Sequence, residues 1–120
     1  MPAPCTGPSN RTAKQPRFDF GGATEGAAAF QRTAVAFEDL SVAAYKAQVP
    51  RIVEREYLTS AMAIHSVEAR HAAWIRRLAG QAPVAGPFDE PISRATTTLI
   101  VDRTHFVVRT TSRRGPRFTG

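Results

Sequence analysis

The sequence predicts an all-α protein, an antiparallel helical hairpin with irregular tails. Two stretches between residues 26 and 79 repeat apolar residues at three- and four-residue steps, the spacing of one face of an α-helix. Val49-Pro50 separates them, because a proline disfavours the helical conformation of the residue before it. A connection this short makes the two helices neighbours that run in opposite directions.

The first helix is expected to run from Gly26 to about Gln48, with Thr24 as its N-cap. Glu38 borders its apolar stripe, and a carboxylate beside a buried seam needs a partner. The stripe consists of Phe30, Ala34, Phe37, Ser41 and Tyr45.

The second helix is expected to begin at about Arg51 or Glu54 and to end at Leu78 or Ala79. Gly80 follows, a residue type on which helices commonly end. The inner stripe of this helix consists of Leu58, Ala61, Ile64, Glu68, His71, Ile75 and Leu78, with Val67 and Trp74 alongside.

The chain divides into three parts. Residues 1–17 form a basic leader predicted to be disordered, residues 18–92 the helical hairpin, and residues 93–120 an Arg-rich tail predicted to be irregular. Within that tail, residues 96–111 alternate more like a strand, but one strand without a partner is not stable. The excess of positive charge belongs to the two tails, and the Arg-rich tail could attract nucleic acid or an anionic membrane surface nonspecifically. No recognisable module points to a specific nucleic-acid partner.

Cysteine usage and the N-terminal residues bear on the compartment. Cys5 is the one cysteine, so an intrachain disulfide and a thiolate metal cluster are excluded. Neither a secretory signal nor a run of about 18 apolar residues, as a membrane span needs, is visible. As written, the chain is expected in the cytoplasm, unless an N-terminal truncation has removed a signal peptide.

Glu68 and His71 form an E-x-x-H motif. Positions three apart on a helix share a face, so both side chains can point at one ion. Di-iron carboxylate sites in four-helix bundles take a Glu from each of two helices and an E-x-x-H from each of the other two. With Glu38, this chain has one of each, which predicts Glu38, Glu68 and His71 as metal ligands and as half of such a site. The alternative for Glu68 and His71 is a solvent-facing ion pair, with Arg70 or Arg55.

Two further residues lie near these predicted ligands. His65, three residues before Glu68, is expected to be a partly buried polar residue one turn from the site rather than a ligand. Tyr45 lies seven residues after Glu38 and therefore on its face. It is either a hydrogen-bonding support for a site carboxylate or a packing residue with its hydroxyl at the rim.

Three blocks of sequence, residues 30–45, 66–73 and 83–91, resemble the C-terminal half of the ferritin-like domain family. The branch that they resemble contains plant desiccation-related proteins and many uncharacterised bacterial proteins. The resemblance implies half of a four-helix bundle, with Glu38 matching the carboxylate of the third helix and Glu68 and His71 the pair of the fourth. The first two helices are missing, and the residues after Pro91 depart from the usual ending, as in a fragment.

The resemblance implies iron or manganese as cofactor and an oxidase, peroxide-scavenging or iron-handling activity. Since a hairpin leaves its inner face uncovered, the expected partner is a second copy or the missing N-terminal half-bundle; two copies would supply four glutamates and two histidines. The alternatives are a metal-free, stress-related structural or interaction module, an inactive fragment of a longer ferritin-like protein, and a nucleic-acid binder that uses its basic tail. Whether the chain is an enzyme stays open.

Overall fold

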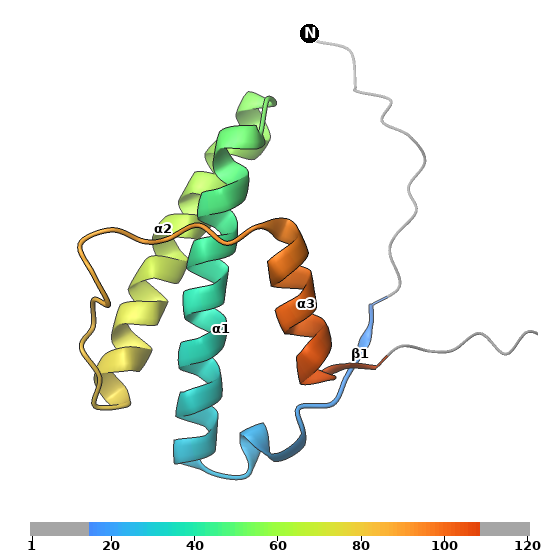
Figure 1. The fold of residues 1–120 in the computed structure, drawn as a ribbon, viewed down its shortest axis with the longest axis vertical. Coiled ribbons are helices and arrows are strands. Elements are labelled where there is room, and N and C mark those ends of the chain that lie inside the picture. Colours follow the sequence, from blue (N-terminus) through green and yellow to red (C-terminus); the bar gives the residue numbers. More distant parts are fainter. Residues whose placement is uncertain (1–14, 109–120) are drawn as a thin grey trace, which may run out of the picture.

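The computed structural model describes residues 15–108 of the chain. Helices α1 and α2 lie side by side and antiparallel, and α3 lies along the other side of α1 (Figure 1). The elements in chain order are β1 (Arg17–Phe18), the 3-10 helix η1 (Gly21–Thr24), α1 (Ala27–Gln48), the 3-10 helix η2 (Val49–Arg51), α2 (Arg55–Leu78), α3 (Arg94–Thr104) and β2 (Val107–Val108). The predicted all-α helical hairpin is confirmed.

The interruption between the two long helices lies where the proline predicts it. The chain leaves α1 through η2, whose Pro50 stands in the first turn, and the extended backbone of Ile52 then ends this turn. The predicted cap of α1 is wrong: Gly26 is the N-cap, and Thr24 closes η1 instead. The second helix begins at Arg55, one residue after the later of the two predicted starts, with Glu54 as its N-cap.

Gly80 ends α2 as predicted. Its φ of +73° lies in the left-handed region, which favours glycine. The Gly80 N–H donates to the Arg77 carbonyl at 3.2 Å, and the Gln81 N–H donates to the Arg76 carbonyl at 2.9 Å. These two bonds form a Schellman motif, which satisfies the last carbonyl groups of the helix and turns the chain sharply.

Helix α3 corrects the prediction for residues 93–120. Residues 94–104 are helical, neither irregular nor a strand, while residues 109–120 of the predicted tail and residues 1–14 of the predicted leader lie outside the described part of the chain. The reason is local. Ser93 caps the helix by accepting a hydrogen bond from the Thr96 N–H at 3.1 Å, and the Thr97 and Thr98 hydroxyls donate to carbonyls four residues back. The threonine hydroxyls therefore bond within a helix, in a segment whose alternation predicted a strand.

The seam between α1 and α2 is narrow and built from small side chains. None of the larger side chains described is completely buried, and many large apolar side chains are exposed. The buried apolar residues are Val35, Leu40, Val42, Ala43, Ala61 and Ala72. None of the described helices is both long and apolar enough to cross a membrane.

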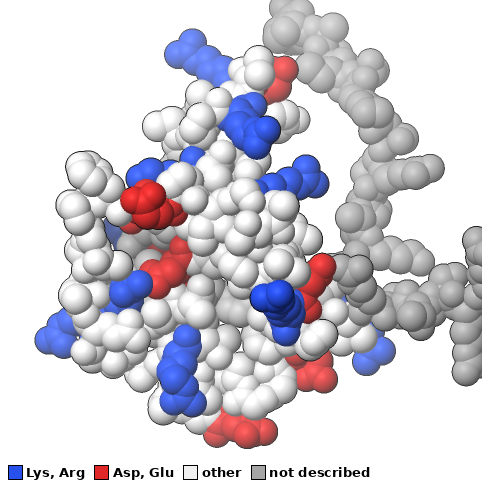
Figure 2. Space-filling model, in the orientation of Figure 1, with Lys and Arg blue, Asp and Glu red and all other residues white. Residues whose placement is uncertain are grey.

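Residues 81–92, which we call the strap, connect α2 to α3. The strap crosses in front of α2 and α1 (Figure 1), and its last residue, Ile92, donates its N–H to the Ala43 carbonyl of α1 at 3.1 Å. Positive and negative side chains are interspersed on the face of the molecule that carries the strap (Figure 2). One face of the hairpin is thus covered by the chain itself.

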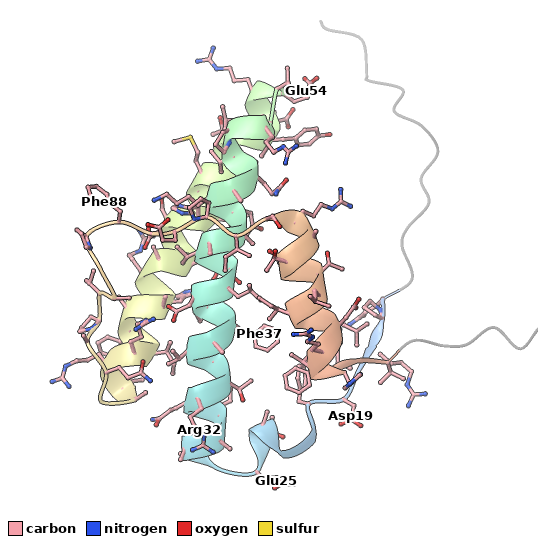
Figure 3. The ribbon with its side chains drawn as sticks, in the orientation of Figure 1. Asp19, Glu25, Arg32, Phe37, Glu54 and Phe88 are labelled. Atoms are coloured by element: carbon pink, nitrogen blue, oxygen red, sulfur yellow. The ribbon has the colours of Figure 1, made fainter. Side chains whose placement is uncertain are left out.

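An aromatic cluster joins the two ends of the described chain. β1 pairs with β2 in antiparallel fashion, and the Asp19 N–H donates to the Phe106 carbonyl at 2.8 Å. Phe37 points from α1 toward α3 (Figure 3) and stacks on Phe106, with ring centroids 5.6 Å apart. Phe106 also meets Phe20 edge to face at 5.5 Å. These contacts hold α3 against α1.

Candidate metal centre

The structure brings Glu38, Glu68 and His71 together across the seam between α1 and α2. The Nδ1 atom of His71 lies 3.4 Å from Oε2 of Glu68, three residues earlier on α2. The same nitrogen lies 3.7 Å from Oε2 of Glu38, which α1 contributes. One candidate ligand atom from each residue falls within 4.8 Å of the others. Two carboxylates and an imidazole thus converge on one point. Among the described residues, neither Arg55 nor Arg70 forms an ion pair with this cluster.

The cluster is partly withdrawn from water. The side chains of Glu38 and Glu68 are 29% and 24% exposed, whereas that of His71 is 56% exposed. Oε2 of Glu38 is buried and has no hydrogen-bond partner among the described residues. Burial and the neighbouring Glu68 carboxyl raise the pKa of Glu38, and His71 acts in the opposite direction. The site therefore favours added positive charge at Glu38, either a proton or a cation.

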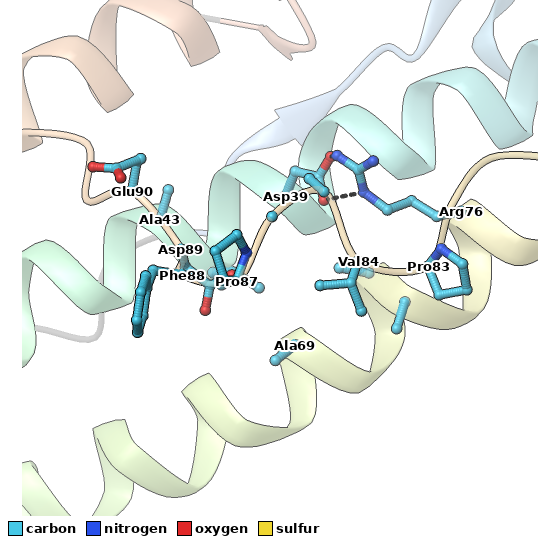
Figure 4. Close-up of a pocket in the computed structure, with 15 residues that line it drawn as sticks. Asp39, Ala43, Ala69, Arg76, Pro83, Val84, Pro87, Phe88, Asp89 and Glu90 are labelled. Carbon is cyan, nitrogen blue, oxygen red and sulfur yellow. Dashed lines mark hydrogen bonds and ion pairs between the residues drawn. The ribbon is translucent and has the colours of Figure 1, made fainter.

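Asp39, the residue after Glu38, points to the opposite side of the seam. Nε of Arg76 donates to Oδ1 of Asp39 at 2.9 Å, and Nη2 of the same guanidinium contacts Oδ2. The pair stands in a groove of about 640 Å³ between the alanine-rich seam and the strap (Figure 4). The two residues of this pair lie 37 positions apart in the sequence.

The two residues considered beside the ligands lie outside the cluster. His65 lines a separate pocket with Lys46, Met62 and other residues, and its Nε2 atom is buried without a hydrogen-bond partner in the described chain. Tyr45 is half-buried, and among the described residues its hydroxyl shows no hydrogen bond to a site carboxylate. The structure therefore gives neither residue a contact with the three predicted ligands.

The cluster lies in the middle of an uncovered apolar surface, which we call the open face. Helical spacing places Phe30, Ala34 and Tyr45 on the Glu38 side of α1, and Ile64, Val67 and Leu78 on the side of α2 that carries Glu68 and His71. Phe30, Ile64, Val67 and Leu78 are all exposed. The strap covers the other side of the same seam. At the Phe30 end of the open face, Phe30 and Ala34 line a pocket together with Phe20 and Phe106.

The donor set suits a transition-metal ion. Carboxylate oxygens and an imidazole nitrogen are the ligands that iron and manganese take in carboxylate-bridged sites. Oε2 of Glu38, a buried acceptor without a donor, is the atom that a cation would satisfy. The residues present therefore fit one half of a di-metal centre.

A family model described as a ferritin-like domain matches residues 5–81 of the chain, which is more than half of it. The match includes α1 and α2, and with them Glu38, Glu68 and His71, and it ends one residue after Gly80. Comparisons with curated proteins and with solved structures found no match.

Proposed function

The chain belongs to the ferritin-like domain family, and we propose that it supplies Glu38, Glu68 and His71 as half of a di-iron or di-manganese centre. The observation that carries this proposal is the position of Glu38. Its carboxylate comes from a different helix, yet it reaches the same nitrogen as Glu68. A local ion pair within the E-x-x-H motif would not require a second carboxylate whose Oε2 atom is buried and accepts no hydrogen bond from the described residues.

The proposal extends to the place of the chain within its family. The hairpin corresponds to the C-terminal half of a four-helix bundle, in the branch that includes plant desiccation-related proteins. Its order of elements supports a half-bundle, since a helix with one glutamate precedes a helix with the E-x-x-H motif. The complementary helix pair comes from a second copy or from an N-terminal half-bundle.

The activity follows from what such a centre does. When bound, iron or manganese would supply oxidation and reduction chemistry, as in an oxidase, a peroxide scavenger or an iron-handling protein. The protein's own part is to hold the ligands: the seam fixes Glu38 opposite His71 and Glu68, and the partly buried carboxylates concentrate negative charge. The exposed edge of His71 leaves the cluster accessible from the open face.

The second candidate function is a metal-free structural or interaction module, related to stress, or an inactive remnant of a longer bundle. The open face favours it, because exposed apolar surface is typical of a binding surface. In this case His71 and the two glutamates would serve as an ion-pair cluster. Metal content separates the two functions.

The test is elemental analysis of the full chain after loading with iron(II) or manganese(II) and removal of unbound metal. We expect about one metal ion per chain, the value for two per assembled bundle. Either Glu68→Ala or His71→Ala should abolish binding, since each removes one of only three ligands. His65→Ala is the matched control, a histidine of the same helix outside the cluster, and it should retain most of the metal.

Two results would count against the proposal. Metal retained by the double variant Glu68→Ala/His71→Ala would show that the ligands lie elsewhere. No bound metal in the natural sequence, with the helical content of the chain intact by circular dichroism, would favour the metal-free module.

A further inference from the structure

We infer that the partner on the open face is a second copy of this chain, and that divalent metal controls the pairing. This inference rests on the proposed metal centre and adds the partner and the condition for its docking. It follows from three features: which face is bare, where the half-site lies on it, and which charges would meet when it closes.

The open face is the surface left for a partner helix pair. The strap and the groove beneath it occupy one side of the seam, and α3 covers the flank of α1 that carries Phe37. On the remaining side, the helical positions around the cluster hold apolar or small uncharged residues, and the described charges there are those of the three candidate ligands. Such a surface favours burial against another apolar helical face.

The position of the half-site favours a second copy over an unrelated partner. Glu38 lies at the middle of α1 (Ala27–Gln48), and Glu68 lies near the middle of α2 (Arg55–Leu78). A half-site at mid-height meets its own copy when two hairpins pack face to face about a two-fold axis, whichever way the second pair of helices runs. If the half-site lay near one end of the hairpin, a second copy whose helices run the other way would place its own half-site at the opposite end. The face is therefore self-complementary in the way that an isologous dimer requires.

The same symmetry makes pairing depend on a cation. Two copies would bring four carboxylates together, two each from Glu38 and Glu68, on a face without Lys or Arg at the positions described. Like charges at this separation repel, and burial removes the water that would screen them. Metal ions that bind between the two half-sites offset this repulsion. By linkage, a cation that binds the dimer better than the monomer shifts the equilibrium toward the dimer.

The experiment is sedimentation equilibrium of the full chain in EDTA and in manganese(II), with bound manganese measured on the same samples. We expect manganese to lower the dissociation constant of the dimer by at least about tenfold. The isosteric variant Glu38→Gln/Glu68→Gln should dimerise more tightly than the natural chain in EDTA, because it lacks the four charges, and should not respond to manganese.

A matched pair of valines tests the surface itself. Val67→Asp places a charge on the open face, where the side chain is 37% exposed, and should raise the dissociation constant about tenfold or more. Val84→Asp makes the same change on the strap, where the side chain is 68% exposed, and should leave it unchanged. A chain that binds manganese with an unchanged dissociation constant would overturn the inference and leave the metal centre standing. A chain that binds no manganese would overturn both.

Discussion

At the level of single residues, the environment of Glu38 favours a nearby positive charge. Its carboxylate is drawn out of water beside a second carboxylate, and both effects raise its pKa. An ionised Glu38 therefore lowers the stability of the metal-free fold, whereas a cation bound at the same place would remove the penalty. The burial that destabilises the metal-free fold with an ionised Glu38 therefore also favours the binding of a cation at this carboxylate.

The raised pKa predicts how stability depends on pH in metal-free protein. Below the ordinary pKa of 4.5, Glu38 is protonated in both the folded and the unfolded chain and adds no penalty. As the pH rises, the unfolded chain ionises first, so the folded state loses stability until the pH passes the folded pKa. The variant Glu38→Gln lacks this loss. Chemical denaturation of both proteins between pH 4 and pH 7 should show a gap in unfolding free energy that favours Gln and widens with pH; a gap that narrows would contradict the assignment.

Local spacing explains why the candidate ligands could be predicted and Asp39 could not. Glu68 and His71 are three residues apart on one helix, and Glu38 follows the stripe of its own helix, so periodicity alone gives each a face. The Asp39–Arg76 pair depends on the register of α1 against α2. Neither residue carries a local signal of that register.

At the level of elements, polar side chains connect the two helices of the hairpin on both sides of the seam. The cluster of Glu38, Glu68 and His71 bridges α1 and α2 on the open face, and the Asp39–Arg76 pair bridges them on the strap side. The seam between these two polar bridges consists of small and medium side chains, which allow the two helices to approach closely but bury little apolar area. The polar bridges therefore carry an unusual share of the specificity of helix pairing.

Removal of the Arg76 side chain tests this role. Arg76→Ala leaves the partly buried Asp39 carboxylate without its two charged hydrogen bonds, and we expect a loss of roughly 1–2 kcal/mol in unfolding free energy. Arg77→Ala removes the same side chain from the neighbouring exposed position and should change stability by less than about 0.5 kcal/mol. Thermal denaturation of the two variants under identical conditions measures the difference. Equal losses would show that the ion pair contributes nothing specific.

Gly80 tests the termination of α2 in the same way. An alanine at a φ of +73° is strained, so Gly80→Ala should cost about 1 kcal/mol and loosen the start of the strap. Gly86→Ala is the control within the strap, because its Cβ would meet only the Phe88 carbonyl oxygen at an ordinary 3.9 Å. Hydrogen exchange of the Gln81 amide reports on the motif directly. An unchanged exchange rate in Gly80→Ala would argue against it.

Helix α3 is the described helix that the sequence pattern did not predict. The two long helices follow from periodicity, proline and glycine, signals that act within a few residues. Residues 94–104 have mixed periodicity, and their threonines favour strands over helices. What decides the outcome is the Ser93 cap together with contacts to α1, and only the cap is local.

At the scale of the whole molecule, the segments outside α1 and α2 lie on the strap side of the hairpin and along the flank of α1. The strap covers the side that carries Asp39 and Arg76, α3 covers one flank of α1, and the aromatic cluster around Phe106 ties β1, α1 and the end of α3 together. On the open face, Phe20 and Phe106 reach the Phe30 end, where they line a pocket with Phe30 and Ala34, while Ile64, Val67 and Leu78 stay exposed. This asymmetry separates the molecule into a part that stabilises the hairpin and a part that presents the candidate centre.

Phe106→Ala tests whether those two parts are independent. The ring contacts Phe20 and Phe37, so its loss should lower the unfolding free energy by about 2 kcal/mol, less than for a fully buried phenylalanine because Phe106 is only half-buried. Hydrogen exchange should accelerate in β1, α3 and β2, while any metal binding at Glu38 and His71 persists, since the ring contacts of the cluster involve neither side chain. Phe88→Ala, at a position 80% exposed on the strap, should leave both properties unchanged. Loss of metal together with the aromatic contacts would instead mean that α3 sets the position of α1, and that the covered side and the open face form one cooperative unit.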